Sequence, residues 1–425
     1  MHESELPEAV GQVGVPLEEF ETKPERPWLY GLLIAPSGVV ANGVVQGGVL
    51  AYLLSQQHVS TGRQSALIAI LSFPTTWYFL WAPITDFFIR RRTWLLCGGL
   101  LAAVLMGLAF HRTDLSARST LVLMFASACL GQLVVSSCGG MMGAMRSVAA
   151  RKSAGSFYQA GSLGFGALAT WGLIWLYPRT GHNVLAVAAA AMIAVPTLFA
   201  FFAPAQPEIA TGTVKGTAQR VWQECKETFF HWKALPYVAC MTFPMASGSA
   251  IGLLTGLAQQ YHVQGDSVAW VNGWLGGVLM AGGSGVMALI HTRARASVVY
   301  MIVALINCAA MSVLWLGPMT PWTYYAGVTS YLFTVGACYA MFTAVVLEFL
   351  GDSGKSGSGR YSIINSLGNV PVLYMLRLDG WGGDKWGARG VGAVETVVGG
   401  IGATILLGYF LTRRGVKARG ADAAG

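Results

Sequence analysis

Charged side chains are scarce in this sequence. Of its 425 residues, only 11% are Asp, Glu, Lys or Arg, whereas a soluble domain carries about 25%. Hydrophobic residues make up 54% of the chain, and its mean hydropathy is +0.54. The shortage of charge therefore argues against a soluble protein and indicates one that lies in a lipid bilayer.

Signals for processing, metal binding and catalysis are missing as well. The first 27 residues contain seven Glu and no apolar core segment, so we expect no cleavable signal peptide. No two of the seven Cys have the spacing of a metal or redox site. All seven His fall in tails, loops or the ends of apolar runs. We therefore expect no metal, no cofactor and no enzymatic activity.

Long apolar runs are what the sequence has instead. A membrane-spanning helix needs about 20 mainly apolar residues. By this measure the sequence predicts an all-α membrane protein with twelve transmembrane helices and both ends of the chain on the same side. The predicted spans cover roughly residues 28–55, 65–88, 93–110, 119–145, 155–177, 184–204, 234–258, 267–290, 297–317, 322–350, 361–378 and 391–412.

The twelve spans fall into two groups of nearly equal length. A six-helix bundle at 28–204 has 177 residues, and a second at 234–412 has 179. The connection between them, 205–233, is the longest in the chain, and aromatic residues at helical spacing in its second half predict an amphipathic helix along the membrane interface. Tails at 1–27 and 413–425 complete the division.

The two halves also share a short stretch of sequence. Residues Gly155–Gly164 and Gly359–Gly368 align with an offset of 204 residues and have Gly, Ser, Leu and Gly in matching places. This match lies where the fifth span would repeat as the eleventh if the halves were duplicated. The sequence therefore predicts two bundles related by pseudosymmetry.

Positive charge is unevenly distributed along the chain, whose formal net charge is +8. On the predicted topology, 20 of the 27 Lys and Arg lie on one side of the membrane and seven on the other. Cytoplasmic loops carry such an excess. We therefore place both termini in the cytoplasm and interpret the basic residues as topology signals, which argues against nucleic acid as a partner.

One stretch, Trp77–Leu96, joins two apolar runs through a basic turn. The first run includes Asp86, three consecutive arginines follow at Arg90, Arg91 and Arg92, and the second run starts at once. The stretch resembles the loop between the second and third spans of the major facilitator superfamily. Within that superfamily it is most similar to the AmpG-type anhydromuropeptide permeases and their relatives, the siderophore and acetyl-CoA transporters.

This resemblance implies a fold and a function. Two six-helix bundles would rock around a central site, giving alternating access. Asp86 and Arg90 to Arg92 would latch the cytoplasmic ends of the bundles. The protein would be a monomeric permease of the bacterial inner membrane that takes up a medium-sized polar solute, such as an anhydromuropeptide, with protons. A siderophore or other small-solute permease, or a non-transporting membrane sensor or scaffold, are the alternatives.

Polar side chains mark the spans that would enclose a transport site. Spans 3 and 6 have almost none, so we expect them to face lipid while the polar spans face a cavity. Hydrogen bonds between helices and aromatic packing would also account for such residues. The residues that we expect in the cavity are Asn42, Gln46, Tyr52, Gln132, Tyr158, Gln159, Tyr339, Asn365 and Asn369.

Acidic residues inside the predicted spans are few. Glu348 lies near the cytoplasmic end of the tenth span, and Glu395 lies about one turn into the twelfth. The muropeptide permeases carry acids in the fourth span, but the comparable stretch here, Gln132–Cys138, has none. Proton coupling therefore depends on Glu348 or Glu395, unless both carboxylates merely reach the membrane surface.

Overall fold

The computed structural model is helical throughout the part of the chain that it describes. No strand occurs there, in agreement with the all-α prediction. Asp86, Asn365, nearly all of the N-terminal tail and most of the predicted linker 205–233 lie outside the described residues. The described residues are 26–85, 89–143, 145, 148–203, 234–290, 295–350, 363–364 and 366–422, with scattered positions between 216 and 232.

The N-terminal half begins with a helix that changes type along its length. Residues Gly38–Val45 form a π-helical segment, η1, which continues directly from the first α-helix. The elements of this half are α1 Leu29–Ser37, η1 Gly38–Val45, α2 Val49–Gln56, α3 Thr61–Thr76, α4 Tyr78–Ile84, α5 Arg91–His111, α6 Arg118–Gly143, α7 Val148–Leu176, η2 Tyr177–Arg179, α8 His182–Leu198 and η3 Phe199–Phe202.

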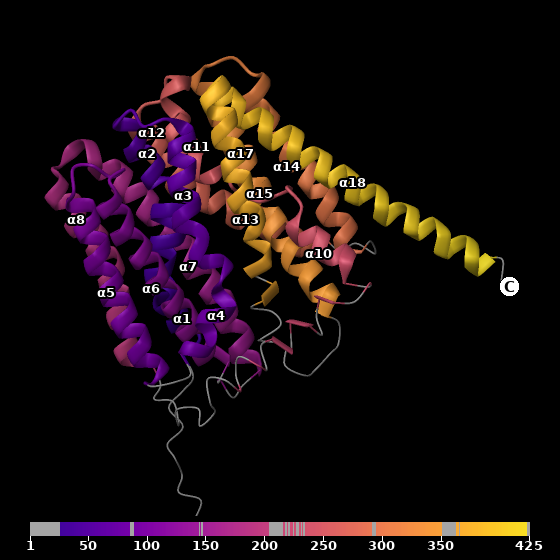
Figure 1. The fold of residues 1–425 in the computed structure, drawn as a ribbon, viewed down its shortest axis with the longest axis horizontal. Helices are drawn as coiled ribbons and strands as arrows, with labels where there is room; N and C mark the ends of the chain where they lie inside the picture. The colour runs from indigo at the N-terminus through magenta and orange to yellow at the C-terminus, as the bar shows by residue number, and fades with distance from the viewer. Residues whose placement is uncertain are drawn as a thin grey trace, which may run out of the picture.

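The C-terminal half lies beside the N-terminal half in Figure 1, with its orange and yellow helices next to the indigo and magenta ones. It also contains a π-helical segment, η5. Its elements are α10 Leu235–Thr242, α11 Ile251–Leu257, η4 Ala258–Tyr261, α12 Gly265–Val268, η5 Ala269–Leu275, α13 Gly276–Leu289, α14 Ala296–Leu316, α15 Pro321–Leu350, α17 Val370–Trp386 and α18 Ala388–Asp422.

Eight helices of the described chain are long and apolar enough to cross a membrane. The other four predicted spans fall on short, broken or glycine-rich helices, namely α3, α10 with α11, η5 with α13, and α17. The predicted count of twelve is therefore not confirmed by length and composition. The eight helices are Leu29–Gln56, Arg91–His111, Arg118–Gly143, Ser153–Arg179, His182–Phe202, Ala296–Leu316, Pro321–Val346 and Ala388–Thr412.

Two outer helices expose apolar side chains, as expected of lipid-facing spans. Helices α5 and α8 pack together and lie at the outer edge of the N-terminal half in Figure 1. Val104 of α5 is 56% exposed and Val187 of α8 is 68% exposed. These helices correspond to the third and sixth predicted spans, whose lack of polar residues indicated this position.

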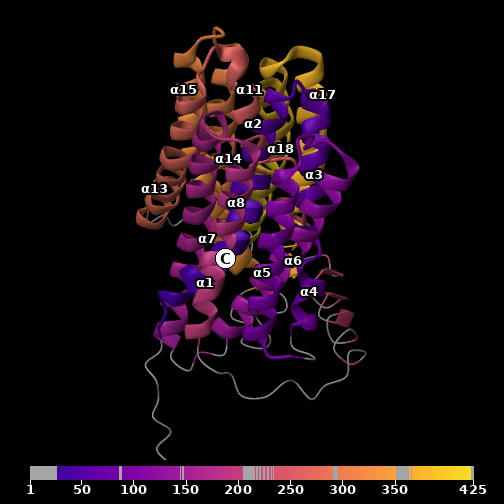
Figure 2. The same cartoon turned by 90° about the vertical axis from the view of Figure 1, so that its left-hand side faces the viewer.

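The two halves meet chiefly where α2 packs on α11, α3 on α17, and α7 on η5. Figures 1 and 2 show α2 beside α11 and α3 beside α17. Hydrogen bonds join the halves here, from Thr255 Oγ1 to the Gly48 carbonyl at 2.6 Å and from the Gly62 amide to Asp384 Oδ1 at 2.7 Å. We call this end of the molecule, where α2, α11 and α17 finish, the closed end.

Pro36 and Gly38 would favour a bend near the start of the first predicted span, but the chain bends later. Pro36 lies inside α1, and the chain stays helical through Gly38, where the hydrogen bonding becomes π-helical. The helix instead breaks before Gly48, whose φ of +98° is a conformation that favours glycine. A Cβ at Gly48 would lie 2.5 Å from Thr255 Oγ1, so glycine also permits the close contact between the two halves.

Candidate functional site

A cavity of about 650 Å³ lies between the two halves. Its walls come from η1 and α7 on one side, and from α10, α13, α14, α15, the start of α17 and the segment before α11 on the other. Its volume is in the range of small-molecule sites. Asn369 lies in the wall, immediately before α17. The 17 residues of α17 lead from there to the closed end, a distance of about 26 Å along the helix.

Five of the residues that the sequence places in a cavity line this one: Asn42, Gln46, Gln159, Tyr339 and Asn369. Asn42 is held in place because its Nδ2 donates to Ser162 Oγ of α7 at 2.9 Å. Gln159 and Tyr339 are exposed, the latter by 37%, so both side chains present surface to the cavity. The structure therefore brings together amide and phenol groups from both halves.

Three predicted cavity residues lie elsewhere, and Asn365 is outside the described chain. Tyr52 is buried toward the closed end, with its ring 6.3 Å from that of Tyr177 in an edge-to-face contact. Tyr158 packs against an apolar cluster around α1. Gln132 lines a separate small pocket that it shares with Gln46.

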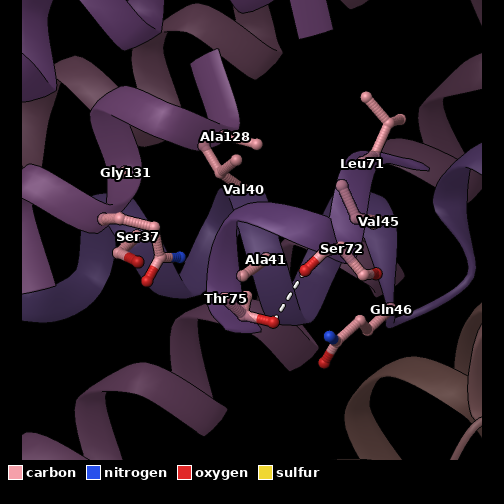
Figure 3. A pocket seen from close by; sticks show the side chains of 11 residues that line it. Ser37, Val40, Ala41, Val45, Gln46, Leu71, Ser72, Thr75, Ala128 and Gly131 are labelled. Atoms are coloured by element: carbon pink, nitrogen blue, oxygen red, sulfur yellow. Dashed lines mark hydrogen bonds between the residues drawn. The ribbon is translucent and has the colours of Figure 1, made fainter. Parts of the chain in front are cut away.

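This small pocket has room for one water molecule at most, at about 10 Å³. Figure 3 shows Gln46 beside Ser72 and Thr75 of α3, and Thr75 Oγ1 donates to the Ser72 carbonyl at 2.7 Å. The pocket is too small for a solute of any size. Gln46 therefore lies between this polar pocket and the larger cavity.

No charged side chain lines the large cavity among the described residues. Its polar groups are amides and hydroxyls, and Met241, Met245 and Phe342 supply apolar surface. A charged solute would lose its hydration there without gaining an ionic partner from these residues. The described walls therefore offer hydrogen-bonding groups and apolar surface to a bound molecule.

One wall of the cavity is an irregular segment, 243–250, that separates α10 from α11. Ala246 has a φ of +50° and Gly248 a φ of +71°, so the backbone here is strained at a non-glycine residue. A Cβ at Gly248 would collide with the Tyr339 hydroxyl, which shows how closely α15 approaches. Discontinuous helices of this kind form substrate and ion sites in transporters.

Two acidic residues are buried together just behind this segment. Asp379 of α17 is 0% exposed and Glu395 of α18 is 4% exposed. Ser249 lies between them, with its Oγ 2.7 Å from Asp379 Oδ2 and 2.6 Å from Glu395 Oε1. Glu395 Oε1 also accepts hydrogen bonds from the Ala250 amide at 3.2 Å and the Tyr331 hydroxyl at 3.4 Å.

Glycines allow the two acids to meet. A Cβ at Gly390 of α18 would collide with the backbone of Gly382 in α17, so only glycine lets these helices approach so closely. Sequence reasoning identified Glu395 but missed Asp379, because it ended the eleventh span at residue 378. The signal for a longer helix was there: Pro371 lies in the first turn of α17, and Gly387, with a φ of +62°, ends it.

Glu348, the other predicted proton site, has a different environment. Its Oε1 accepts a hydrogen bond from the Tyr237 hydroxyl at 3.2 Å, and its Oε2 accepts one from the Ser297 amide at 3.2 Å. Ser297 is in the first turn of α14, whose free amides favour a negative charge. Glu348 therefore caps a helix, and it is not among the residues that line the cavity.

The predicted latch is only partly visible. Asp86 lies outside the described residues, and Arg90 is exposed just before α5. Arg91 lies against Gly140 of α6, and the Arg92 guanidinium is 5.7 Å from the ring centroid of Phe201. These contacts are within the N-terminal half, so the role of these residues as a latch between the halves stays a prediction.

Comparison with known proteins supports the fold. No protein-family model matches the sequence, and no curated protein sequence matches it. Solved structures do match. A D-xylose-proton symporter is 13% identical with a TM-score of 0.65, and the match covers 89% of this chain and 95% of that one. The nucleoside transporter NupG is 12% identical with a TM-score of 0.65 (91% and 99% covered), and the peptide transporter POT in complex with sulfate is 12% identical with a TM-score of 0.66 (91% and 96% covered). These neighbours are transporters of the major facilitator type. At such low identity the likeness shows only that this chain shares the fold of these three proteins.

Proposed function

We propose that this chain is a secondary transporter that moves a medium-sized, uncharged polar solute by alternating access between two six-helix bundles. The observation that carries the proposal is the cavity of about 650 Å³, which both halves line. The contacts between the halves at the closed end block access to this cavity from one side of the molecule. On this proposal the four short or broken helices also cross the bilayer, giving twelve spans.

The orientation follows from the distribution of charge. The end opposite the closed end carries Arg90 to Arg92 and Arg295. Because cytoplasmic loops carry the excess of Lys and Arg, we assign that opposite end and both termini to the cytoplasm. The closed end then faces outward, and the cavity is shut off from the outside. A bacterial inner membrane is the location that the resemblance to permeases favours.

The lack of charged side chains among the described cavity residues favours uncharged solutes over charged ones. The names of the structural neighbours specify xylose, nucleoside and peptide for those proteins. An anhydromuropeptide, the substrate favoured by resemblance, has sugar rings that suit the aromatic and amide walls. Its peptide carboxylates, however, have no cationic partner among the described cavity residues. We therefore place a neutral glycoside or similar solute ahead of a muropeptide, a siderophore or an acyl-CoA.

A solute panel tests this proposal. The purified chain is screened by thermal shift against neutral sugars and nucleosides, an anhydromuropeptide, a siderophore and acetyl-CoA, and each stabilising solute is then tested for counterflow in proteoliposomes. We expect a neutral solute to stabilise the protein and to exchange across the membrane. Gln159→Leu in the cavity wall should reduce both signals, whereas Gln259→Leu, exposed in η4 outside the cavity, should not.

The same panel separates the alternatives. If a charged solute is the only one that exchanges, the argument from the neutral cavity is wrong, although the chain is still a transporter. If no solute stabilises the protein or exchanges, and solutes do not protect a cysteine placed at Asn42 or Gln46, the chain is better explained as a membrane sensor or scaffold.

A further inference from the structure

The hydrogen bonds around the buried acids determine how many protons they hold. Ser249 has one hydroxyl proton, yet its Oγ lies within 2.7 Å of an oxygen of each carboxyl group. If both carboxyls were ionised, the Ser249 hydroxyl could donate to only one of them. The other close contact would then have no proton between its two oxygens, which would repel each other. A second proton must therefore be present on Asp379 or Glu395.

The remaining contacts assign this proton to Asp379. Glu395 Oε1 accepts from the Ala250 amide and the Tyr331 hydroxyl in addition to Ser249, as a carboxylate would. Asp379 Oδ1, in contrast, is buried and has no hydrogen-bond partner among the described residues. An unpartnered oxygen costs less on a neutral acid than on a carboxylate. Asp379 Oδ2 then donates to Ser249 Oγ, and Ser249 donates to Glu395.

No cation compensates the pair among the described residues around it. Arg63, the charged residue of α3, donates to the Ser116 hydroxyl at 3.3 Å. Arg377 and Lys385 of α17 are exposed, whereas Asp379 on the same helix is buried. Arg389 of α18 donates to the Gly317 carbonyl at 3.1 Å.

The other helices around the pair bring hydroxyl and thiol groups to it. Helices α10 and α14 contain no charged residue, and Glu348 of α15 caps α14. The titratable groups that do face the pair are Tyr331 and Tyr339 of α15 and Cys308 of α14, whose Sγ is 3.8 Å from the Glu395 carbonyl. The pair therefore has to limit its own charge by holding a proton.

A second hydroxyl connects the pair to the central cavity. Ser247 lines the cavity, and its Oγ donates to Ser249 Oγ at 3.1 Å. The irregular backbone between α10 and α11 makes this possible, because the Ser249 amide also donates to Ser247 Oγ at 3.2 Å. A continuous hydrogen-bonded path therefore runs from the cavity wall through Ser247 and Ser249 to Asp379.

We propose that Asp379, Ser249 and Glu395 bind one exchangeable proton, and that Ser247 passes this proton between the acid pair and the central cavity. When the proton leaves, the Ser247 hydroxyl turns toward water in the cavity, and the Ser249 hydroxyl turns from Glu395 toward Ser247. Ser249 then gives its proton to Ser247 and takes the one from Asp379 Oδ2. Ser247 in turn releases its own proton to water in the cavity. Asp379 is left as a carboxylate, and no other bond changes.

A sodium ion is the other occupant that carboxyl and hydroxyl oxygens could bind. The two contacts of Ser249, at 2.7 and 2.6 Å, are those of O–H···O hydrogen bonds to acid groups. Oxygens that are already joined in this way leave no space for a metal ion among them. The geometry therefore favours the proton.

Infrared spectroscopy of the full chain in lipid nanodiscs tests the proton site without any solute. At neutral pH the exposed acids are ionised, so a C=O stretching band of a protonated carboxyl group should come from the buried pair. We expect Asp379→Asn and Glu395→Gln to remove or shift this band and Glu348→Gln to leave it unchanged. A band that persists in the Asp379→Asn, Glu395→Gln double variant would overturn the proposal, as would loss of the wild-type band when sodium chloride replaces potassium chloride.

The rate of hydrogen–deuterium exchange at the acid pair tests the role of Ser247. The band shifts when the carboxyl proton exchanges with deuterium, so the rate of the shift in D₂O reports transfer to the cavity. We expect Ser247→Ala to keep the band but to slow exchange by about tenfold or more, which corresponds to about 1.4 kcal/mol in the barrier. Ser284→Ala is the control, because this hydroxyl also lines the cavity but donates to the Gly336 carbonyl. Equal exchange rates in the two variants would exclude the path through Ser247.

Proton binding by the acid pair does not depend on the proposed function. Coupling of this proton to solute transport does, because it requires the chain to be a transporter. In proteoliposomes, Asp379→Asn should retain counterflow of a neutral solute taken from the panel but lose accumulation driven by a pH gradient. If the wild type shows no counterflow, the carrier function fails and the infrared result still stands. If Asp379→Asn accumulates the solute as the wild type does, the pair is not the coupling site although the chain is a carrier.

Discussion

Arg179 and Asp266 join the two halves of the molecule at the closed end through two parallel hydrogen bonds. Arg179 Nη1 lies 2.8 Å from Asp266 Oδ1, and Nη2 lies 2.8 Å from Oδ2. The guanidinium also stacks over the Trp175 ring, 4.5 Å from its centroid. Because the two residues belong to different halves, this pair must separate when the closed end opens.

Loss of this ion pair should therefore favour opening. We expect Asp266→Asn to lower the population of the closed conformation by only a few-fold, because both side chains are exposed and such pairs contribute little. Distances between spin labels on α2 and α11 would measure this population. Asp114→Asn is a matched control, since Asp114 is also at the closed end but accepts hydrogen bonds from Ser116 within one half. Equal effects of the two variants would contradict a role for the pair in closure.

The same pair should make closure sensitive to acid but not to neutral pH. The hydrogen bonds from Arg179 hold the pKa of Asp266 below its ordinary range. A lowered pKa means that the closed form favours the carboxylate, so this contribution to closure is complete above about pH 5 and is lost as pH falls through the lowered pKa. The label distances should therefore be constant at neutral pH and change only in acid. Asp266→Asn should abolish that acid response.

Two tyrosines that the sequence predicts to line the cavity have different places in the structure. Tyr339 lines the cavity, whereas Tyr158 packs in the cluster around α1. Removing a hydroxyl that binds a solute costs about 0.5 to 1.5 kcal/mol. We expect Tyr339→Phe to raise the KM of solute exchange by about 2- to 10-fold and Tyr158→Phe to leave it unchanged. The reverse result would place the solute away from this cavity.

Glu348 should act on stability and not on coupling. Its carboxylate caps the first turn of α14 through the Ser297 amide. Such an interaction contributes about 1 kcal/mol, so Glu348→Gln should lower the melting temperature of the purified protein. Accumulation of solute in response to a pH gradient should continue in this variant. If accumulation is lost while the melting temperature stays the same, Glu348 rather than Asp379 is the coupling residue.

Gly48 provides a test of the contact between the halves. Its φ of +98° and its closeness to Thr255 both oppose a side chain, and a strained backbone costs about 1 to 3 kcal/mol. Gly48→Ala should therefore lower the melting temperature and increase the accessibility of cysteines introduced near Thr255 from the closed end. In Gly164→Ala, the added methyl would meet no atom within 4 Å, and we expect no loss of stability.

Much of the architecture follows from hydropathy alone. Span length and the absence of polar residues correctly identified α5 and α8 as outer helices, because the cost of polar groups in lipid acts at every exposed position. Asn42 and Gln46, four residues apart, both line the cavity because about one turn of the π-helical segment η1 separates them. These predictions needed only local spacing and the properties of the bilayer.

Tyr52 shows where local spacing fails. It follows a π-helical segment and the break at Gly48, and both change the direction in which later side chains point. A helical period of 3.6 residues therefore cannot be continued from Gln46 to Tyr52. Asp379 shows a different limit. An acid near the end of an apolar run resembles a residue at the membrane surface, and only the contact with α18 reveals that it is buried.

The two π-helical segments have a mechanical consequence. Both η1 and η5 pack against α7, which is 29 residues long and contains no proline. Bends in helices concentrate at π-type turns, where the regular hydrogen-bond ladder is already disturbed. Helix α7 thus lies between two segments, one in each half, in which the regular hydrogen-bond ladder is already disturbed. We expect these two widened turns to bend if the halves tilt relative to each other, so that α7 keeps its contacts with both of them.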